Sequence, residues 1–315
     1  LGSQMTKYAF YLDIKKKCQN ECCYIDTTPF YTLKMWNGYE LNRIFGIEDK
    51  DLYDQYSEEE KKQCDSLPYK NIAMKKMHDM EPERTLYCTN RGRIIKYGTE
   101  QTFGVRLKGK LQSIVNKYWF EKIMHDDRHI DKYPANYLTI AGNVYYDEFN
   151  HTSDLYFKDA VREIKEAFIF PEFEDEKNKN LAKEMLTTES VALHVRRSDH
   201  MYDNIALFER DYFKKSVELI RKNAKNLKFY IFSEEADWCS KHLEELGISD
   251  TEEVCFVNWN HGTESFRDMQ LMTYCKHNIL AISSFSWWGC YLSQNREGKI
   301  ACAPKGYWFD IENHF

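Results

Sequence analysis

The sequence contains no apolar run close to the roughly 20 residues that a membrane-spanning helix needs. It also lacks an excess of basic residues: the formal net charge is −6, which argues against a nucleic-acid-binding surface. The ten cysteines include no CxxC pair and no zinc-type spacing, so we expect reduced thiols. The first residues do not resemble a signal peptide. These absences favour a globular protein of a bacterial, cytoplasmic type, and they leave a weak association with the inner membrane surface open.

The second half of the chain predicts a nucleotide-binding type of fold. Strand-like and helix-like segments alternate there, which is typical of βαβ units and a parallel sheet. Apolar residues fill the strand candidates, as expected when helices cover both faces of the sheet. We expect strands at 190–195, 227–233, 254–257, 279–283 and 299–303, and helices at 209–223, 235–246, 264–277 and 287–294.

The first half is less regular, and the length of 315 residues suits two domains. The charged, aliphatic-poor stretch 171–183 is predicted to be an interdomain linker. We therefore expect an N-terminal α/β domain over 1–186, a C-terminal Rossmann-like domain over 187–303 and a tail over 304–315. Within the first domain, the patterns predict a helix at 4–17, strands at 22–26 and 137–141, and an amphipathic helix at about 153–168.

The run from Val191 to Asp199 carries the strongest chemical signal. A short apolar stretch ends in His194, Arg196, Arg197 and Asp199. A buried strand of a parallel sheet delivers such groups to the edge where α/β folds bind their ligands. Two adjacent guanidinium groups suit a pyrophosphate, because each can donate planar, bidentate hydrogen bonds. An exposed turn with an Asp–Arg ion pair explains this segment equally well.

A second signal lies where the strand predicted at 279–283 ends in Ser283, Ser284 and Ser286. Hydroxyl groups and free backbone N–H groups at a helix start bind anions, and the helix dipole adds to the attraction. Taken alone, the segment is better explained by a serine cap and two core tryptophans. Beside an arginine-bearing strand end in the same sheet, it favours a phosphate site.

Acidic residues near the same sheet edge form a third signal. Asp268 precedes a mostly apolar helix, and its carboxylate could accept two hydrogen bonds from guanine or could be an ordinary surface group. The strand at 227–233 ends in Ser233 and is followed by Glu234 and Glu235. These acids could orient a ribose or Arg196, or could simply favour the start of the next helix.

These motifs resemble those of a known family. Residues 194–199, His-Val-Arg-Arg-Ser-Asp, resemble the HxRRxD motif of α1,2-, α1,6- and protein O-fucosyltransferases. Residues 283–289, SSFSWWG, are similar to a signature of the bacterial α1,2-fucosyltransferases of glycosyltransferase family 11. The opening at 1–5 and the YAF at 8–10 resemble the GLGNQM and YAF of that family, whose first strand would precede this loop. The similarity extends to residues 303–305.

The resemblance implies a GT-B-like α/β fold, with two Rossmann-type domains and the active site in the cleft between them. It implies inverting transfer of L-fucose from GDP-β-L-fucose to the 2-hydroxyl of a terminal galactose, on an oligosaccharide or O-antigen acceptor. Arg196 would bind the β-phosphate and stabilise the leaving GDP as negative charge develops. The donor-binding residues expected from the motifs and the resemblance are His194, Arg196, Arg197, Ser233, Glu234, Asp268, Ser283, Ser284, Phe285 and Ser286.

An inverting transfer also needs a group that takes the proton of the acceptor hydroxyl. The α1,6 relatives carry a glutamate shortly after the arginine motif, where this chain has Asn204 with Asp203 beside it. Asp203 is therefore the candidate base, and Asp199 either contributes to catalysis or only orients Arg196. Transfer could also proceed with little help from a base, because its transition state is strongly oxocarbenium-like.

The resemblance implies that no metal or other cofactor is required. Asp49 and Asp51 have the D-x-D spacing that holds Mn²⁺ and diphosphate, but no apolar strand precedes them, so we interpret the spacing as chance. His125, followed by two aspartates, is better explained as a helix end. Without a metal, Arg196 and the helix start at Ser284 must neutralise the diphosphate.

Departures from the family pattern leave two alternatives open. Ser198 replaces the usual glycine of the arginine motif, His200 stands where tyrosine is frequent, and Ser3 replaces the asparagine of the opening loop. The region 142–146 lacks the Trp-Gln pair common there. The alternatives are transfer to a different acceptor hydroxyl, and a non-catalytic protein that binds sugar nucleotides.

Overall fold

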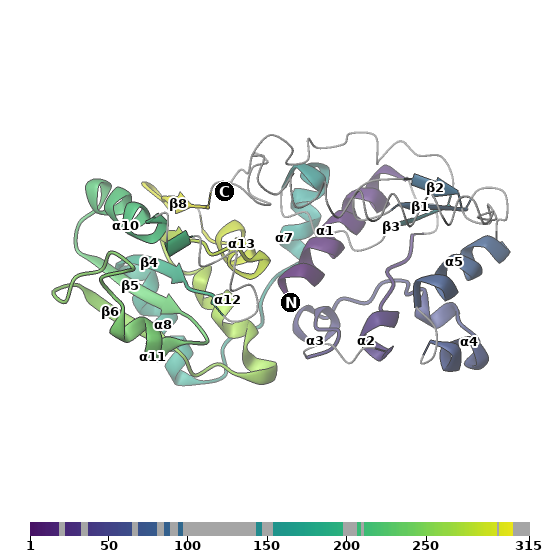
Figure 1. Ribbon diagram of the computed structural model, residues 1–315, viewed down its shortest axis with the longest axis horizontal. Helices are drawn as coiled ribbons and strands as arrows, with labels where there is room; N and C mark the ends of the chain where they lie inside the picture. Colours follow the sequence, from purple (N-terminus) through teal and green to yellow (C-terminus); the bar gives the residue numbers. More distant parts are fainter. Residues whose placement is uncertain are drawn as a thin grey trace, which may run out of the picture. The chain divides into compact units, whose positions relative to one another are not determined.

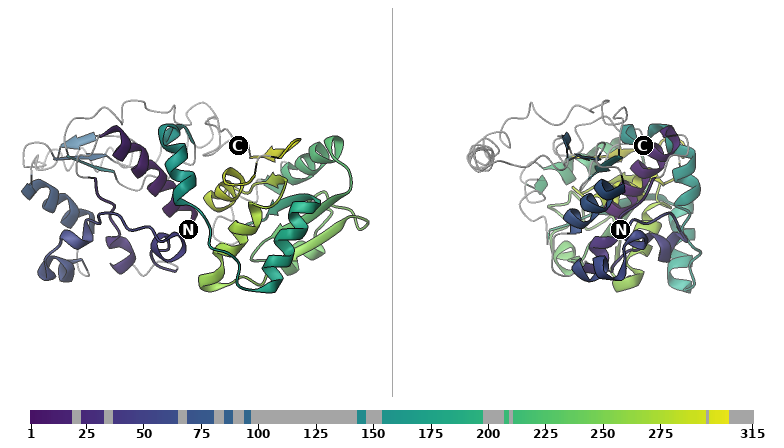
Figure 2. Two further views of the ribbon diagram at one scale, coloured as in Figure 1. Left: turned by 180° about the vertical axis from the view of Figure 1, so that it is seen from behind. Right: turned by 90° about the vertical axis from the view of Figure 1, so that its right-hand side faces the viewer.

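The computed structural model describes the chain in several stretches (Figures 1 and 2). By its internal contacts the chain divides into two compact units. The first consists of Leu1–Leu12, Tyr39–Glu48 and Thr152–Phe315, and the second of Asp13–Gly38 and Asp49–His151. The domain limits expected at 186 and 187 stay a prediction, and the first unit takes residues from both sides of them. The residues described are 1–18, 23–32, 37–64, 69–80, 85–88, 94–96, 143–146, 154–197, 207–208, 211–294 and 296–304.

The first unit is built on a five-stranded sheet with the order β6-β5-β4-β7-β8, in which every neighbouring pair is parallel. Numbered along the chain, this order is 3-2-1-4-5, that of a Rossmann-type sheet. The order reverses between β4 and β7, and such sheets bind ligands outside the carboxyl ends of their strands at that point. The strands are β4 (Glu189–His194), β5 (Leu227–Phe232), β6 (Glu253–Val257), β7 (His277–Ile279) and β8 (Ala301–Cys302).

Helices surround this sheet, as the apolar strands require (Figure 1). Helices α8 (Glu176–Thr187) and α12 (Phe266–Met272) pack on one face, in a core that joins Met185 and Leu271 to Tyr230 and Phe232. Helix α10 (Tyr212–Asn223) contacts β7, and α11 (Ala236–Lys241) contacts β5 and β6. The predicted α/β class with a parallel, Rossmann-like sheet is confirmed.

The linker predicted at 171–183 is wrong, because most of that stretch forms helix α8. Asp175 caps the helix: its side chain accepts a hydrogen bond of 2.7 Å from the backbone N–H of Asn178. Ala182 and Met185 are almost fully buried in the core on the sheet, whereas Lys183 between them is exposed. A helix that buries a narrow apolar stripe has a highly polar composition, which resembles that of a linker.

Other elements differ from expectation mainly at their ends. β7 ends at Ile279, earlier than the strand expected at 279–283. The buried residues 280–282 follow it, and the N–H of Leu280 donates a 2.9 Å hydrogen bond to the carbonyl of Cys302. In place of a strand at 22–26, the described residues show a single parallel bridge between Ile25 and Asp51. The expected strand at 137–141 lies outside the described residues. Helix α11 ends at Lys241, earlier than expected, since the chain turns repeatedly between 243 and 247.

Helix α13 (Ser284–Tyr291) contains both tryptophans of the SSFSWWG motif, and both are fully buried. Trp288 stacks on Phe157, with ring centroids 5.6 Å apart, and meets Phe168 edge-on at 5.1 Å. Its indole N–H donates a 3.0 Å hydrogen bond to the hydroxyl of Thr6. The tryptophans are therefore core residues. The other helices of this unit are α1 (Gly2–Lys17), which continues into the second unit, α3 (Leu41–Phe45) and α7 (Val161–Ala167), with 3₁₀ turns at Asp154–Tyr156, Lys158–Ala160 and Gly262–Glu264.

The second unit contains a three-stranded sheet of order β2-β1-β3, with β1 antiparallel to β2 and parallel to β3. The D-x-D residues belong to this unit and are used locally. The Asp51 carboxylate accepts hydrogen bonds from the backbone N–H groups of Thr27 and Tyr53 at 3.1 and 3.0 Å, and Asp49 pairs with Lys15. Its elements are α2 (Thr28–Thr32), a 3₁₀ turn (Tyr53–Gln55), α4 (Glu58–Gln63), α5 (Tyr69–Met80), β1 (Thr85–Cys88), β2 (Ile94–Lys96) and β3 (Asn143–Tyr146).

No helix in the described part of the chain is long and apolar enough to cross a membrane.

Candidate functional site

Arg196 and Ser283 meet at the point where the strand order of the sheet reverses. β4 ends at His194, and one more residue, Val195, stays attached to the sheet through a 3.0 Å hydrogen bond to the carbonyl of Phe232. Arg196 therefore leaves the sheet at its carboxyl edge. Its guanidinium Nη1 donates a 3.2 Å hydrogen bond to Oγ of Ser283, which follows β7. Arg196 and Ser283 belong to two motifs, and the two residues, 87 positions apart in the sequence, thus meet at one edge of the sheet.

The start of helix α13 is shaped by its serines. Ser283 has extended backbone angles, and its Oγ also accepts a 3.2 Å hydrogen bond from the N–H of Phe285. Ser286 is buried, and its hydroxyl donates to the carbonyl of Ser283. Ser284 is partly exposed, with its hydroxyl 3.4 Å from that of Ser3. Of the three predicted serines, Ser283 and Ser286 support the helix start, and Ser284 offers a partly exposed hydroxyl there.

The start of α1 lies directly on this helix start. A Cβ atom at Gly2 would lie 2.7 Å from the backbone N of Phe285 and the carbonyl carbon of Ser284, which is closer than real Cβ atoms come. Only glycine allows this approach. Sequence reasoning assigned no site role to Gly2, although the likeness of the opening loop to GLGNQM was a signal for it.

The second arginine of the motif has a different environment. The guanidinium of Arg197 is 3.2 Å from a carboxylate oxygen of Glu235 and lies over the ring of Trp238, with its central carbon 3.8 Å from the ring centroid. Trp238 in turn stacks on His242, with centroids 4.2 Å apart. The structure thus pairs Glu235 with Arg197. The role of Trp238 was not foreseen, because only the fold brings α11 to the end of β4.

His194 stands at the end of β4 beside Phe285, with ring centroids 5.9 Å apart. Burial, with a smaller contribution from the nearby charge of Arg196, lowers the pKa of His194 to about 3. Its imidazole is therefore neutral at physiological pH. Its Nδ1 atom is buried and has no hydrogen-bond partner among the described residues.

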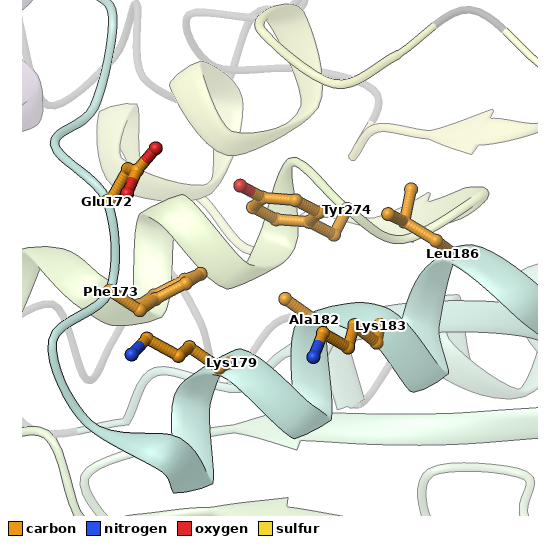
Figure 3. Close-up of a pocket in the computed structure, with 7 residues that line it drawn as sticks. All are labelled: Glu172, Phe173, Lys179, Ala182, Lys183, Leu186 and Tyr274. Carbon is orange, nitrogen blue, oxygen red and sulfur yellow. The ribbon is translucent and has the colours of Figure 1, made fainter.

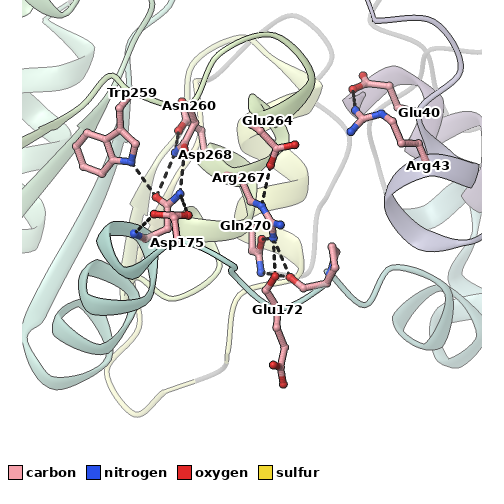
Figure 4. A network of polar contacts seen from close by, with 12 residues as sticks. Glu40, Arg43, Glu172, Asp175, Trp259, Asn260, Glu264, Arg267, Asp268 and Gln270 are labelled. Atoms are coloured by element: carbon pink, nitrogen blue, oxygen red, sulfur yellow. Dashed lines mark hydrogen bonds and ion pairs between the residues drawn. The ribbon is translucent and has the colours of Figure 1, made fainter.

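Asp268 lies in the first turn of α12 (Figure 4). One oxygen of its carboxylate accepts a 2.7 Å hydrogen bond from the side-chain amide of Asn260. Burial raises the pKa of Asp268 to about 7, and the Asn260 hydrogen bond opposes this shift. Raised acid pKa values are frequent at binding sites, although structural carboxyl groups also show them.

The remaining predicted residues divide between described and undescribed parts. Ser233 follows β5, and its hydroxyl accepts a 3.0 Å hydrogen bond from the N–H of Glu235; Glu234 lies in the same turn. Asp199 and Asp203, the catalytic candidates, lie outside the described residues, as do Ser198, His200 and Asn204. All site roles stay predictions.

A separate pocket lies alongside α8 (Figure 3). Phe173, Ala182 and Tyr274 form its apolar wall, and Lys179 and Lys183 are at its rim. None of the predicted site residues lines it. It is therefore distinct from the carboxyl edge where Arg196 and Ser283 meet.

Comparison with known proteins identifies the family of the chain. The family model described as "Glycosyl transferase family 11" matches residues 103–308, which include the arginine motif, Asp268 and helix α13. The chain belongs to glycosyl transferase family 11. The family expected from the arginine and tryptophan motifs is thereby confirmed.

Individual relatives have related activities. An α-1,2-colitosyltransferase of Escherichia coli is 36% identical over 140 residues, which are 42% of this chain and 46% of that protein. The O-antigen biosynthesis glycosyltransferase WbnK of Escherichia coli is 24% identical, and the match covers 99% of this chain and 93% of WbnK. Galactoside α-(1,2)-fucosyltransferase 1 of Rattus norvegicus is 30% identical over 33% of this chain and 28% of its own length. The matches to the first and third of these relatives span less than half of each protein.

Proposed function

We propose that this family 11 chain transfers L-fucose from GDP-β-L-fucose to the 2-hydroxyl of a terminal galactose, with inversion to an α-linkage. The active site would lie in the cleft of a GT-B-like pair of domains. The hydrogen bond between Arg196 and Ser283 carries the proposal. It places a guanidinium and a helix start together at the sheet edge where Rossmann-type folds bind diphosphates.

The reaction follows from these groups. The oxygen of the galactose 2-hydroxyl bonds to C1 of fucose, the bond from C1 to the β-phosphate oxygen breaks, and its electron pair leaves with GDP. Arg196 and the start of α13 would stabilise the negative charge that develops on that phosphate, and we propose that they do so without a metal ion. Asp203 is the proposed acceptor of the hydroxyl proton, and Asp199 would act on the reacting groups or orient Arg196.

The first prediction tests this function directly. Incubation with GDP-fucose, lactose or N-acetyllactosamine, and EDTA should release GDP and form a product that NMR identifies as 2-O-fucosylated galactose. Binding of GDP-fucose without turnover would keep the donor assignment and contradict these acceptors. Failure to bind GDP-fucose would contradict the whole proposal, and activity that EDTA abolishes would contradict metal independence.

The second prediction concerns pH and Asp268. An ionised carboxylate can accept hydrogen bonds from N1–H and the 2-amino group of guanine, whereas a protonated one loses an acceptor site. Because the pKa of Asp268 is raised from 3.8 to about 7, kcat/KM for GDP-fucose should increase from pH 5.5 to 7.5 and then level off. Asp268→Asn should remove this dependence.

The raised pKa of Asp268 should also make the folded protein less stable as the pH rises from 4 to 7. In this range the carboxyl group keeps its proton in the folded state but loses it in the unfolded state.

A second candidate differs in the donor sugar. The relative named α-1,2-colitosyltransferase supports a nucleotide-activated colitose as an alternative donor. The two donors can be compared directly by kcat/KM on one galactoside acceptor. Transfer to another acceptor hydroxyl would appear as a different linkage in the NMR spectrum, and a non-catalytic binding protein would bind the donor with no turnover of any acceptor.

A further inference from the structure

A chain of side-chain amides lies behind Asp268. Asn178 of α8 and Asn260 of the loop after β6 are buried, with 2% and 8% of their surfaces exposed. The Nδ2 of Asn178 donates a 2.8 Å hydrogen bond to Oδ1 of Asn260. The Nδ2 of Asn260 donates at 2.7 Å to Oδ1 of Asp268 and, more weakly, at 3.3 Å back to Asn178. Figure 4 shows this network.

Trp259 and Asp175, at the end of the network away from Asp268, fix the donor and acceptor roles of the amides. The indole of Trp259 can only donate, and its N–H binds Oδ1 of Asn178 at 3.0 Å. The carboxylate of Asp175 can only accept when ionised, and it takes a 2.9 Å hydrogen bond from Nδ2 of Asn178. These two partners set the orientation of the Asn178 amide. That amide then sets the orientation of Asn260, so that an N–H group faces Asp268.

The consequence for Asp268 is a fixed carboxylate with one oxygen left over. Oδ1 is held by Asn260, and Oδ2 accepts no hydrogen bond from the described residues. A carboxylate that is held on one side presents its other oxygen in one direction. An ionised carboxylate oxygen can only accept hydrogen bonds, so Oδ2 suits the N–H groups at the edge of a ligand.

We propose that Asn178 and Asn260 are positioning residues that aim the carboxylate of Asp268 at the 2-amino edge of a purine. They thereby set the preference of the donor site for guanine over hypoxanthine. The inference rests on the proposed function only in placing a guanine nucleotide at this sheet edge. It assigns to α8 a part in the choice of base.

The test compares GDP with IDP, whose base lacks only the 2-amino group. Calorimetry measures the binding of each nucleotide to the full chain. Steady-state kinetics with GDP-fucose and IDP-fucose measures turnover. The wild-type protein should prefer the guanine nucleotide by about 10- to 100-fold, the range for one hydrogen bond to a charged group. Asn260→Ala should reduce this preference by about tenfold while changing IDP affinity by less than about threefold. If Asn260 had only a structural role, Asn260→Ala would reduce the affinities for GDP and IDP equally.

Two further variants keep the test decisive. Trp259→Phe retains the ring, over which Lys177 lies at 3.4 Å, but removes the N–H that orients Asn178. Trp259→Phe should reduce the preference for GDP over IDP by about threefold. If Asn260→Ala does not fold, Trp259→Phe is used as the test variant in its place. Asn223→Ala removes an exposed amide on α10 and should leave the preference unchanged. An unchanged preference in folded Asn260→Ala or Trp259→Phe would overturn the inference.

The wild-type result separates this inference from the proposed function. Equal binding of GDP and IDP would overturn the inference and leave fucosyl transfer intact. A guanine preference that depends on Asn260, in a protein that transfers no fucose, would support the inference and contradict the proposed sugar. A protein that binds neither nucleotide would contradict both.

Discussion

Arg196→Ala should reduce kcat/KM for GDP-fucose by at least tenfold, and by more than 100-fold if the guanidinium acts mainly in the transition state. A hydrogen bond to a charged group contributes about 1.5–3 kcal/mol, and each 1.4 kcal/mol corresponds to a factor of ten. The residue lies at the reversal point of the sheet and binds Ser283, the cap of α13. Steady-state kinetics of GDP release measures the effect.

Two comparisons make this result specific. Arg196→Lys keeps the charge but loses the planar pair of donors, so it should recover only part of the activity. Arg162→Ala removes an arginine that is 78% exposed in the same unit and should change kcat/KM by less than about twofold. If Arg196→Ala kept more than a third of wild-type activity, the assignment of Arg196 to the leaving phosphate would be wrong.

Trp288→Ala should lower the free energy of unfolding by about 3–5 kcal/mol, the range for truncating a buried aromatic residue. The side chain is fully buried among Phe157 and Phe168, and its indole N–H binds Thr6. Trp288→Phe should cost less, because it keeps most of the aromatic contact and removes only the hydrogen bond and part of the volume. Urea denaturation followed by circular dichroism measures both.

The control for this measurement is Ile169→Ala, next to Phe168 but 69% exposed, which should change stability by less than about 0.5 kcal/mol. A folded Trp288→Ala protein with wild-type stability and no affinity for GDP would show that the indole contacts the ligand. That result would contradict the assignment of the tryptophan pair to the core.

Local sequence patterns predicted the elements of the first unit where burial is uniform. The strand at 227–232 is apolar except for Lys228 and begins where expected, because helices cover both faces of its sheet. Helix α8 was missed because its buried stripe is narrow and most of its residues are charged. β7 ends earlier than expected, because residues 280–282 are apolar and buried but lie beyond the strand. An apolar composition predicts that a segment is buried. Whether the segment pairs as a strand depends on the neighbouring chain segment.

For the site, the sequence alone determined which chemical groups are present and at which strand ends they lie. HxRRxD and SSFSWWG predicted a diphosphate site and the family, because parallel strands deliver their following residues to one edge. Only the tertiary structure decided how these groups are shared. Arg196 binds Ser283, whereas its neighbour Arg197 is taken by Glu235 and Trp238. Asn260 binds Asp268, which is 8 residues further along the chain, and is itself held by Asn178, 82 residues before it. Such pairings depend on the order of the strands and on the packing of α8, α11 and α13, which no local pattern encodes.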